Sequence, residues 1–342
     1  MIYIRTDMNQ TIATGHVMRC LSIADAAKVA GEETTFILAD TQAEKLIESR
    51  GHHVIILGTK WNDMDQELPI IESLIQTNQI KSILIDSYQV TKPYLARLSA
   101  HTRILYMDDL NAFMYPVNTL ICYANYYKKY NYPAHYSATE LYLGPRYAPL
   151  RKEFADRPPK IIKQKVENLL LMSGGSDPCG LLPKLLEALP PKSFRRIDVI
   201  CGIYNSEYDN LQKKYASRQN IHIQKSVSNI ENYMQEADLA VSAGGTTLYE
   251  LCAIGTPTIS YAIVDNQLDN VTAFQDQNII DYAGDTRKNI DITITSILHL
   301  ITKYQDKFAL RAERSQKMQN LVDGQGAFRI AQILKQSYTK FP

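Results

Sequence analysis

The chain has 342 residues, of which 45% are hydrophobic, so it can bury more apolar surface than one core usually holds, and we expect two domains. Lys and Arg total 37 against 36 for Asp and Glu. This balance disfavours nucleic acid or an anionic membrane as a partner and favours a small neutral or phosphorylated ligand.

Cysteine usage and the N-terminus indicate the compartment. The five cysteines are far apart and form no metal-ligand spacing, which is typical of thiols in a reducing cytosol. No apolar signal segment opens the chain, and no apolar run reaches membrane-spanning length. We expect a soluble, cytoplasmic protein without membrane insertion; the sequence does not predict its oligomeric state.

The first part of the chain alternates short β-rich runs with amphipathic segments. The runs that predict strands are MIYIRT, ETTFIL, HHVIIL, KSILID, RILYMD and NTLICYA. The stretches 16–30 and 64–77 have helical periodicity, and Val17, Cys20, Leu21, Ala24 and Ala27 form one apolar stripe on the first. This alternation predicts a parallel sheet covered by helices.

Between about 128 and 165 the alternation breaks in a segment rich in Tyr, Pro and Lys, our candidate interdomain segment. The alternation then resumes, which predicts a second parallel sheet. We expect an N-terminal domain at 1–145, a linker at 146–165, a C-terminal domain at 166–325, and a terminal helix at 326–342 that packs back on the N-terminal domain. Ligands bind beyond the carboxyl ends of such strands, so two facing sheets would hold a ligand in the cleft between them.

Two glycine-containing loops follow predicted strands of the second half. The first holds Gly174, Gly175 and Ser176, and glycines let backbone N–H groups approach an anion. The loop lacks the GxGxxG pattern and a Walker lysine, so NAD binding and P-loop ATP hydrolysis are disfavoured. A tight strand-to-helix turn without a ligand is the alternative.

The second loop leads from a buried strand into a helix, and its residues are Gly244, Gly245, Thr246 and Thr247. The free N–H groups and dipole of that helix favour a diphosphate. Glu250 is placed to accept hydrogen bonds from vicinal ribose hydroxyls, although Thr247 and Glu250 also have the T-x-x-E spacing of a capping box. Gln267 and Asn270 share a helix face and offer amide groups to sugar hydroxyls.

Both halves resemble known families. The glycine loops and DNQLDN resemble the donor-binding half of GT-B nucleotide-sugar enzymes, especially the N-acetylglucosaminyltransferases of peptidoglycan synthesis. The N-terminal half resembles the R-x-D-x(4)-I-x-x-G-H-x-x-R-C signature of the UDP-sugar hydrolases of pseudaminic acid biosynthesis. The matching residues are Arg5, Asp7, Ile12, Gly15, His16, Arg19 and Cys20. IDSYQV, MDDL and LGPRYAPLRKEF continue the match, while Ala13 stands where the family more often has glycine.

The resemblance implies an α/β GT-B fold with two Rossmann-like parallel-sheet domains facing across a cleft. It implies hydrolysis of UDP-2,4-diacetamido-2,4,6-trideoxy-β-L-altrose to the free sugar and UDP, with inverting attack of water and with neither metal nor cofactor. His16 is the candidate base, because imidazole is largely deprotonated at cytosolic pH. Asp7, or a carboxylate of the Asp108–Asp109 pair, is the candidate to orient its other nitrogen.

These considerations predict His16 and Asp7 as catalytic residues. The predicted nucleotide and substrate contacts are Arg5, Gly15, Arg19, Gly174, Gly175, Ser176, Gly244, Gly245, Thr246, Thr247, Glu250, Gln267 and Asn270. Structural alternatives exist: His16 as a buried structural residue, the aspartates as caps, and Arg5 and Arg19 as an internal ion-pair network.

Three other functions use the same fold. A GT-B glycosyltransferase would move the sugar of a UDP-N-acetyl-sugar donor to an acceptor, and a UDP-sugar 2-epimerase would not accumulate free sugar and UDP. A non-catalytic nucleotide-sugar sensor would keep Glu250 and the glycine loops but would not need His16.

Overall fold

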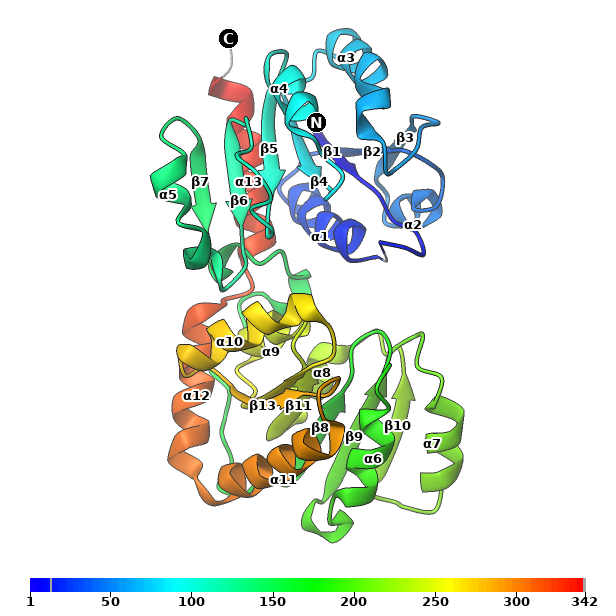
Figure 1. The fold of residues 1–342 in the computed structure, drawn as a ribbon, viewed down its shortest axis with the longest axis vertical. Helices are drawn as coiled ribbons and strands as arrows, with labels where there is room; N and C mark the ends of the chain where they lie inside the picture. The colour runs from blue at the N-terminus through cyan, green and yellow to red at the C-terminus, as the bar shows by residue number, and fades with distance from the viewer. Residues whose placement is uncertain (13, 341–342) are drawn as a thin grey trace. The chain divides into compact units, whose positions relative to one another are not determined.

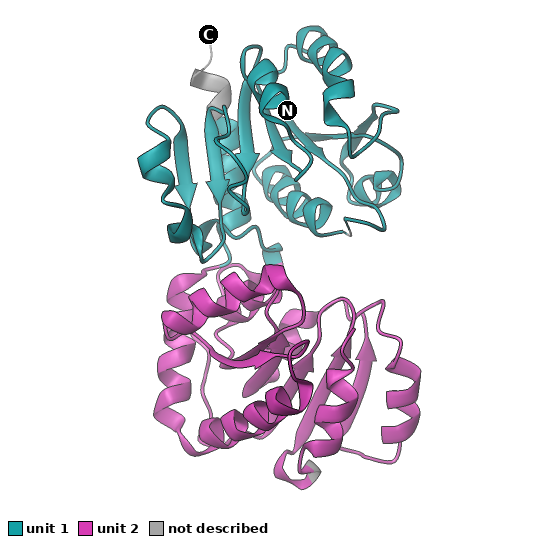
Figure 2. Cartoon of the chain, in the orientation of Figure 1, with its two compact units in different colours: residues 1–152, 324–342 teal, residues 153–323 magenta. Residues whose placement is uncertain are grey.

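The computed structural model describes residues 1–12 and 14–340 and divides into two compact units (Figures 1 and 2). Unit 1 comprises Met1–Lys152 and Gly324–Pro342, and unit 2 comprises Glu153–Asp323. Ala13 and the last two residues of the helix expected at 326–342 lie outside the described residues.

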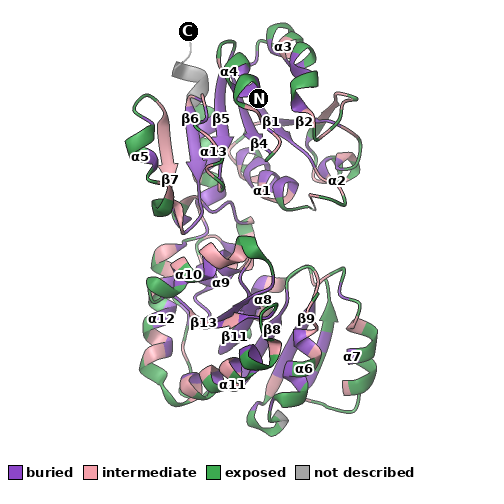
Figure 3. Ribbon diagram, viewed as in Figure 1, coloured by how far each residue is buried: buried purple, intermediate pink, exposed green. Residues whose placement is uncertain are grey.

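Unit 1 contains a seven-stranded parallel sheet in the order β3-β2-β1-β4-β5-β6-β7. Its strands are β1 (Ile2–Thr6), β2 (Thr34–Leu38), β3 (His53–Ile56), β4 (Ser82–Asp86), β5 (Arg103–Met107), β6 (Thr119–Cys122) and β7 (Glu140–Leu143). The central strands are buried along their whole length (Figure 3), as helices on both faces require. Strand β7 falls in the segment where we expected no regular element, because four residues are too few to show a period.

Helices cover both faces of this sheet. They are α1 (Gly15–Val29), α2 (Glu44–Ser49), α3 (Leu68–Thr77), α4 (Lys92–Ser99), the short α5 (Tyr132–His135) and α13 (Gly326–Lys340), with 3-10 turns at Met64–Glu67, Tyr127–Tyr130, Pro145–Tyr147 and Lys152–Phe154. Helix α13 packs beside α1 (Figure 1). A Cβ at Gly326 would lie 2.1 Å from the Ala148 carbonyl oxygen, so only glycine allows α13 to begin there.

Unit 2 contains a six-stranded parallel sheet in the order β10-β9-β8-β11-β12-β13. Its strands are β8 (Asn168–Met172), β9 (Arg196–Cys201), β10 (Ile221–Lys225), β11 (Leu239–Ala243), β12 (Thr258–Ala262) and β13 (Asp281–Asp285). Its helices are α6 (Leu181–Ala188), α7 (Tyr208–Tyr215), α8 (Ile230–Glu236), α9 (Thr247–Ile254), α10 (Leu268–Asp276), α11 (Ile290–Asp306) and α12 (Phe308–Leu321), with 3-10 turns at Pro191–Ser193 and Asp265–Gln267.

Each sheet reverses its strand order once, between β1 and β4 in unit 1 and between β8 and β11 in unit 2. Open α/β sheets bind ligands at such switch points, beyond the carboxyl ends of the strands. The two sheets confirm the predicted α/β class with two Rossmann-like domains. Within the described residues, no helix has both the length and the apolar character needed to cross a membrane.

Candidate functional site

His16 lies at the switch point of unit 1, as the second residue of α1. Its Nδ1 is 2.7 Å from Oδ1 of Asp86, the last residue of β4, and both side chains are buried. Nδ1 also lies 3.0 Å from Arg19 Nη2, which can only donate. Because an ionised carboxylate only accepts hydrogen bonds, the shorter contact with Asp86 favours the tautomer with the proton on Nδ1 and the lone pair on Nε2. His16 therefore has the tautomer of a general base.

Arg19 binds the same carboxylate from one turn further along α1. Its Nε donates to Asp86 Oδ2 at 2.5 Å and its Nη2 donates to Asp86 Oδ1, while Nη1 donates to Tyr123 Oη at 2.9 Å. Burial alone would raise the pKa of Asp86, but the charges and hydrogen bonds of Arg19 and His16 outweigh it and hold the pKa well below its ordinary value. Asp86 is therefore ionised at neutral pH and keeps the imidazole in one orientation.

The expectation that Asp7 orients His16 is wrong, because Asp86 occupies that position. Asp7 Oδ1 instead accepts from the Ala39 N–H at 2.8 Å, and Oδ2 accepts from Arg5 Nη1 at 2.5 Å. The reason is the strand order: β4 is the neighbour of β1, so the residue that ends β4 reaches the start of α1.

The pair Asp108 and Asp109 has two separate roles, and neither carboxylate orients His16. Asp108 accepts hydrogen bonds from the Leu110 N–H at 3.0 Å and the Tyr115 hydroxyl at 2.9 Å, so the capping alternative holds for this residue. Asp109 Oδ2 lies 3.2 Å from Arg19 Nη1 and accepts from the Tyr88 hydroxyl at 2.9 Å. Asp109 therefore belongs to the same polar cluster as His16.

A small hollow lies beside His16. It has about 10 Å³ of free volume and is lined by Asp7, Ile12, His16, Asp86, Ser87, Tyr88 and Gln89. This is about the smallest space that can hold one water molecule. The Tyr88 ring meets the His16 ring edge to face, with centroids 4.6 Å apart. His16 is one of the residues that line the hollow, so a water molecule there would lie next to the candidate base.

Arg5 cannot contact a ligand, which corrects its assignment to substrate binding. It is 0% exposed, and its Nε and Nη2 donate to the two carboxylate oxygens of Glu67 at 2.8 and 2.7 Å. The Tyr94 hydroxyl donates to the same carboxylate at 2.7 Å. The alternative of an internal ion-pair network therefore describes Arg5. Gly15, in contrast, is exposed, and a Cβ there would meet nothing within 4 Å.

The first glycine loop of unit 2 follows β8. Gly174 has φ +75°, and a Cβ on Gly174 or Gly175 would meet nothing within 4 Å, so the backbone is open to a ligand. The loop rests on the turn after β9, since a Cβ at Gly202 would lie 2.2 Å from the Gly174 oxygen. Our sequence reasoning missed Gly202, although a glycine directly after a predicted strand was a visible signal. Ser176 lies in the same loop and is partly exposed.

The second glycine loop follows β11 and is packed against α10. A Cβ at Gly244 would lie 2.2 Å from Val271 Cγ1. Asn270 Nδ2 donates to the Gly244 oxygen at 2.9 Å, and Asn270 Oδ1 accepts from the Tyr249 hydroxyl at 2.9 Å. Asn270 is buried, so it holds this loop in place and does not offer its amide to a sugar, contrary to our expectation.

Gln267 lies close to Gly245 of the second glycine loop. Its Oε1 accepts from the Ile263 N–H at 3.0 Å, and a Cβ at Gly245 would stand 3.7 Å from its Nε2. The Gln267 amide therefore borders the backbone of the second glycine loop.

The start of α9 gives no support to a capping box with Thr247 as the N-cap residue. Helix α9 already begins at Thr247, and Thr246, at the N-cap position, has helical backbone angles. Within the described chain, Thr246 makes no side-chain cap hydrogen bond. Glu250 is partly exposed in the first turn of α9, and its ribose-binding role stays a prediction.

We expect Glu250→Ala to weaken UDP binding by about tenfold or more, because hydrogen bonds to a charged group contribute about 1.5–3 kcal/mol. The free energy of unfolding should stay within about 0.5 kcal/mol of the unaltered protein. Calorimetric titration with UDP and 2′-deoxy-UDP, beside urea denaturation, checks both values, and the variant should discriminate less between the two nucleotides. A loss of about 0.5–2 kcal/mol in stability with ordinary UDP affinity would instead indicate a cap.

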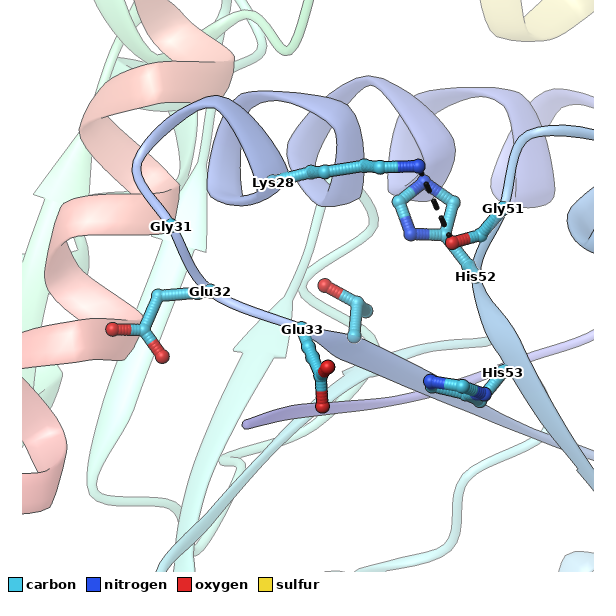
Figure 4. Close-up of a pocket in the computed structure, with 8 residues that line it drawn as sticks. Lys28, Gly31, Glu32, Glu33, Gly51, His52 and His53 are labelled. Atoms are coloured by element: carbon cyan, nitrogen blue, oxygen red, sulfur yellow. Dashed lines mark hydrogen bonds between the residues drawn. The ribbon is translucent and has the colours of Figure 1, made fainter.

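Unit 1 has a second hollow (Figure 4), which has no lining residue in common with the hollow beside His16. Its walls include Thr34 at the start of β2 and His53 at the start of β3, so it borders the amino ends of the strands. Lys28 Nζ donates to the Gly51 oxygen at 3.4 Å across it. Burial and neighbouring positive charges lower the pKa of His52 to about 4. The complete lining is Lys28, Gly31, Glu32, Glu33, Thr34, Gly51, His52 and His53.

Unit 2 matches a known domain family. Residues 169–324 match the glycosyltransferase family 28 C-terminal domain. The chain is similar to the spore coat polysaccharide biosynthesis protein SpsG of Bacillus subtilis, with 26% identity over 58% of this chain and 59% of that protein. It is also similar to the UDP-N-acetylglucosamine–N-acetylmuramyl-(pentapeptide) pyrophosphoryl-undecaprenol N-acetylglucosamine transferase of Campylobacter jejuni, with 32% identity over 41% of this chain and 42% of the transferase.

The whole chain has the fold of GT-B glycosyltransferases. Crystalline MurG from Acinetobacter baumannii superimposes with a TM-score of 0.71 at 15% identity, covering 98% of this chain and all of MurG. In sequence, the matches span about half the length of the curated relatives. Both units thus share the fold of these structures.

Proposed function

We propose that the protein hydrolyses a UDP-sugar at the anomeric carbon, releasing the free sugar and UDP. The observation that carries this proposal is the pair of His16 and Asp86, 2.7 Å apart, beside a hollow of one-water size. A buried base beside a water-sized space is the arrangement that hydrolysis needs.

In the proposed reaction, the oxygen of water forms a bond to the anomeric carbon while the bond from that carbon to the diphosphate oxygen breaks. The electron pair of the broken bond leaves with UDP, and His16 Nε2 takes the proton of the attacking water. Attack opposite the leaving group inverts the anomeric carbon. Asp86 stabilises the imidazolium that forms, as carboxylate partners of histidine bases do. The diphosphate is a good leaving group, so no strong general acid is required.

We assign UDP binding to unit 2. The Gly244 N–H already donates to the Tyr261 oxygen at 2.9 Å, so we assign the diphosphate to the loops at 173–176 and 245–247 and to the start of α9, whose dipole favours negative charge. For the sugar we propose UDP-2,4-diacetamido-2,4,6-trideoxy-β-L-altrose, which the N-terminal signature implies. The similarity to a polysaccharide biosynthesis protein supports a sugar-nucleotide pathway.

A glycosyltransferase is the second candidate, and the similarity to the Campylobacter transferase favours it. An acceptor would then replace water, and the base would take its proton from an acceptor hydroxyl.

Incubation of the purified protein with the UDP-sugar and EDTA, without acceptor, should release UDP and free sugar, because water is the nucleophile and no metal is needed. Coupled UDP detection measures the release, and NMR of the first product identifies the anomer. Release that requires an acceptor would move the assignment to a transferase. Loss of activity with EDTA would contradict the metal-free reaction, and a C2-epimerised sugar would indicate an epimerase.

A further inference from the structure

The turn after β9 carries two large apolar side chains on the surface of unit 2. Ile203 is 60% exposed and Tyr204 is 72% exposed, whereas the last five residues of β9 are buried. Burial of exposed apolar surface contributes a favourable free energy of about 25 cal/mol per Å². A ligand that covered these two side chains would therefore gain binding free energy from their burial.

This turn is fixed to the first glycine loop. The Tyr204 N–H donates to the Gly175 oxygen at 3.0 Å, and the missing Cβ of Gly202 allows the Gly174 oxygen to approach. Tyr204 therefore has a defined position beside the candidate phosphate loop, so a nucleotide bound there would find it already in place.

The opposite side of the switch point carries several polar groups, although Val264 there is 42% exposed. In the sheet order, β9 lies beside β8, whereas β12 lies beside β11, so the segments after these strands flank the glycine loops from two sides. The segment after β12 holds Gln267 and Asp265, and Arg287 Nη1 lies 2.8 Å from Asp265 Oδ1. A ligand with a flat base at one end and a polar sugar at the other therefore fits with its base on the β9 side.

We propose that Tyr204 stacks on the pyrimidine base of the bound nucleotide and that Ile203 packs against its edge. This inference rests on the proposed function, because it places a nucleoside diphosphate at the glycine loops. Every base has a π face, and removal of one stacked aromatic residue usually weakens binding about five- to 150-fold.

The test compares the affinities of UDP and pyrophosphate by calorimetry in the unaltered protein and in Tyr204→Ala, Tyr204→Phe and Ile292→Ala. Ile292 is a matched control, since it is 66% exposed on α11. We expect Tyr204→Ala to weaken UDP binding at least about fivefold without changing pyrophosphate binding. Tyr204→Phe keeps the ring and should retain the affinity, as should Ile292→Ala.

The outcomes separate this inference from the proposed function. Unchanged UDP affinity in Tyr204→Ala would overturn the stacking role and leave the hydrolase proposal intact. An equal loss toward UDP and pyrophosphate would show that the turn only supports the loop, which also overturns stacking. If the unaltered protein bound no UDP, both proposals would be wrong.

Discussion

Replacing His16 by Asn is expected to lower the turnover number by about 10² or more, because general base catalysis contributes about 10²–10⁴-fold. Asparagine keeps a polar group next to Asp86 but has no basic nitrogen to accept the proton of water. UDP affinity should stay close to that of the unaltered protein, because UDP binding is assigned to unit 2. Steady-state kinetics with the UDP-sugar, together with UDP titration, measure both effects.

His53→Asn is the matched control for this experiment. His53 is an exposed histidine of β3, at the edge strand of the same sheet, so its replacement should leave turnover unchanged. Full activity of His16→Asn would reject His16 as the base. Loss of UDP binding in His16→Asn would show that the substitution acts on binding and not on proton transfer.

Replacing Glu67 by Gln is expected to destabilise the protein by about 3–5 kcal/mol, the usual cost of removing one partner from a buried ion pair. Glu67 and Arg5 are both 0% exposed, and glutamine supplies no charge to balance the guanidinium. Arg5 would keep only Asp7, 2.5 Å from its Nη1, as a charged partner. Urea denaturation followed by circular dichroism measures the loss.

Glu72→Gln serves as the comparison for that experiment. Glu72 pairs with Arg97 at 2.6 Å, but the arginine side chain is 55% exposed. A surface pair of this kind contributes about 0–1 kcal/mol, so the two substitutions should differ by several-fold in their effect. Equal losses would mean that the Arg5 network does not stabilise unit 1 as a buried ion pair does.

The repeating pattern of strands and helices was visible in the sequence, because each buried parallel strand is a short apolar run between amphipathic segments. The carboxylate that binds His16, in contrast, could not be recognised from the sequence. Asp86 lies 70 residues away from His16 along the chain, and only the strand order brings the end of β4 beside the start of α1. Local patterns carry no information on that order, so the aspartates named for this role were the wrong ones.

The sequence also did not predict which partners Arg5, Arg19 and Asn270 would bind. Arg5 and Arg19 belong to the same motif, yet Arg5 points into the core toward Glu67 and Arg19 lies at the carboxyl edge beside His16. Alternate residues of a strand face opposite sides, but which face holds a buried carboxylate depends on a distant segment. Asn270 likewise has its amide engaged by Gly244 and Tyr249, which side-chain type alone does not reveal.

Unit 1 is assembled from two separated pieces of the polypeptide, since α13 joins it only after the whole of unit 2. Domains generally fold from the N-terminus as they emerge during synthesis. Here, however, the helix that bears His16 lacks its neighbour α13 until the chain has been synthesised past unit 2. Completion of unit 1 must therefore wait until the segment after unit 2 has been synthesised, and a ribosome that stalls within unit 2 would leave the α13-facing side of α1 uncovered.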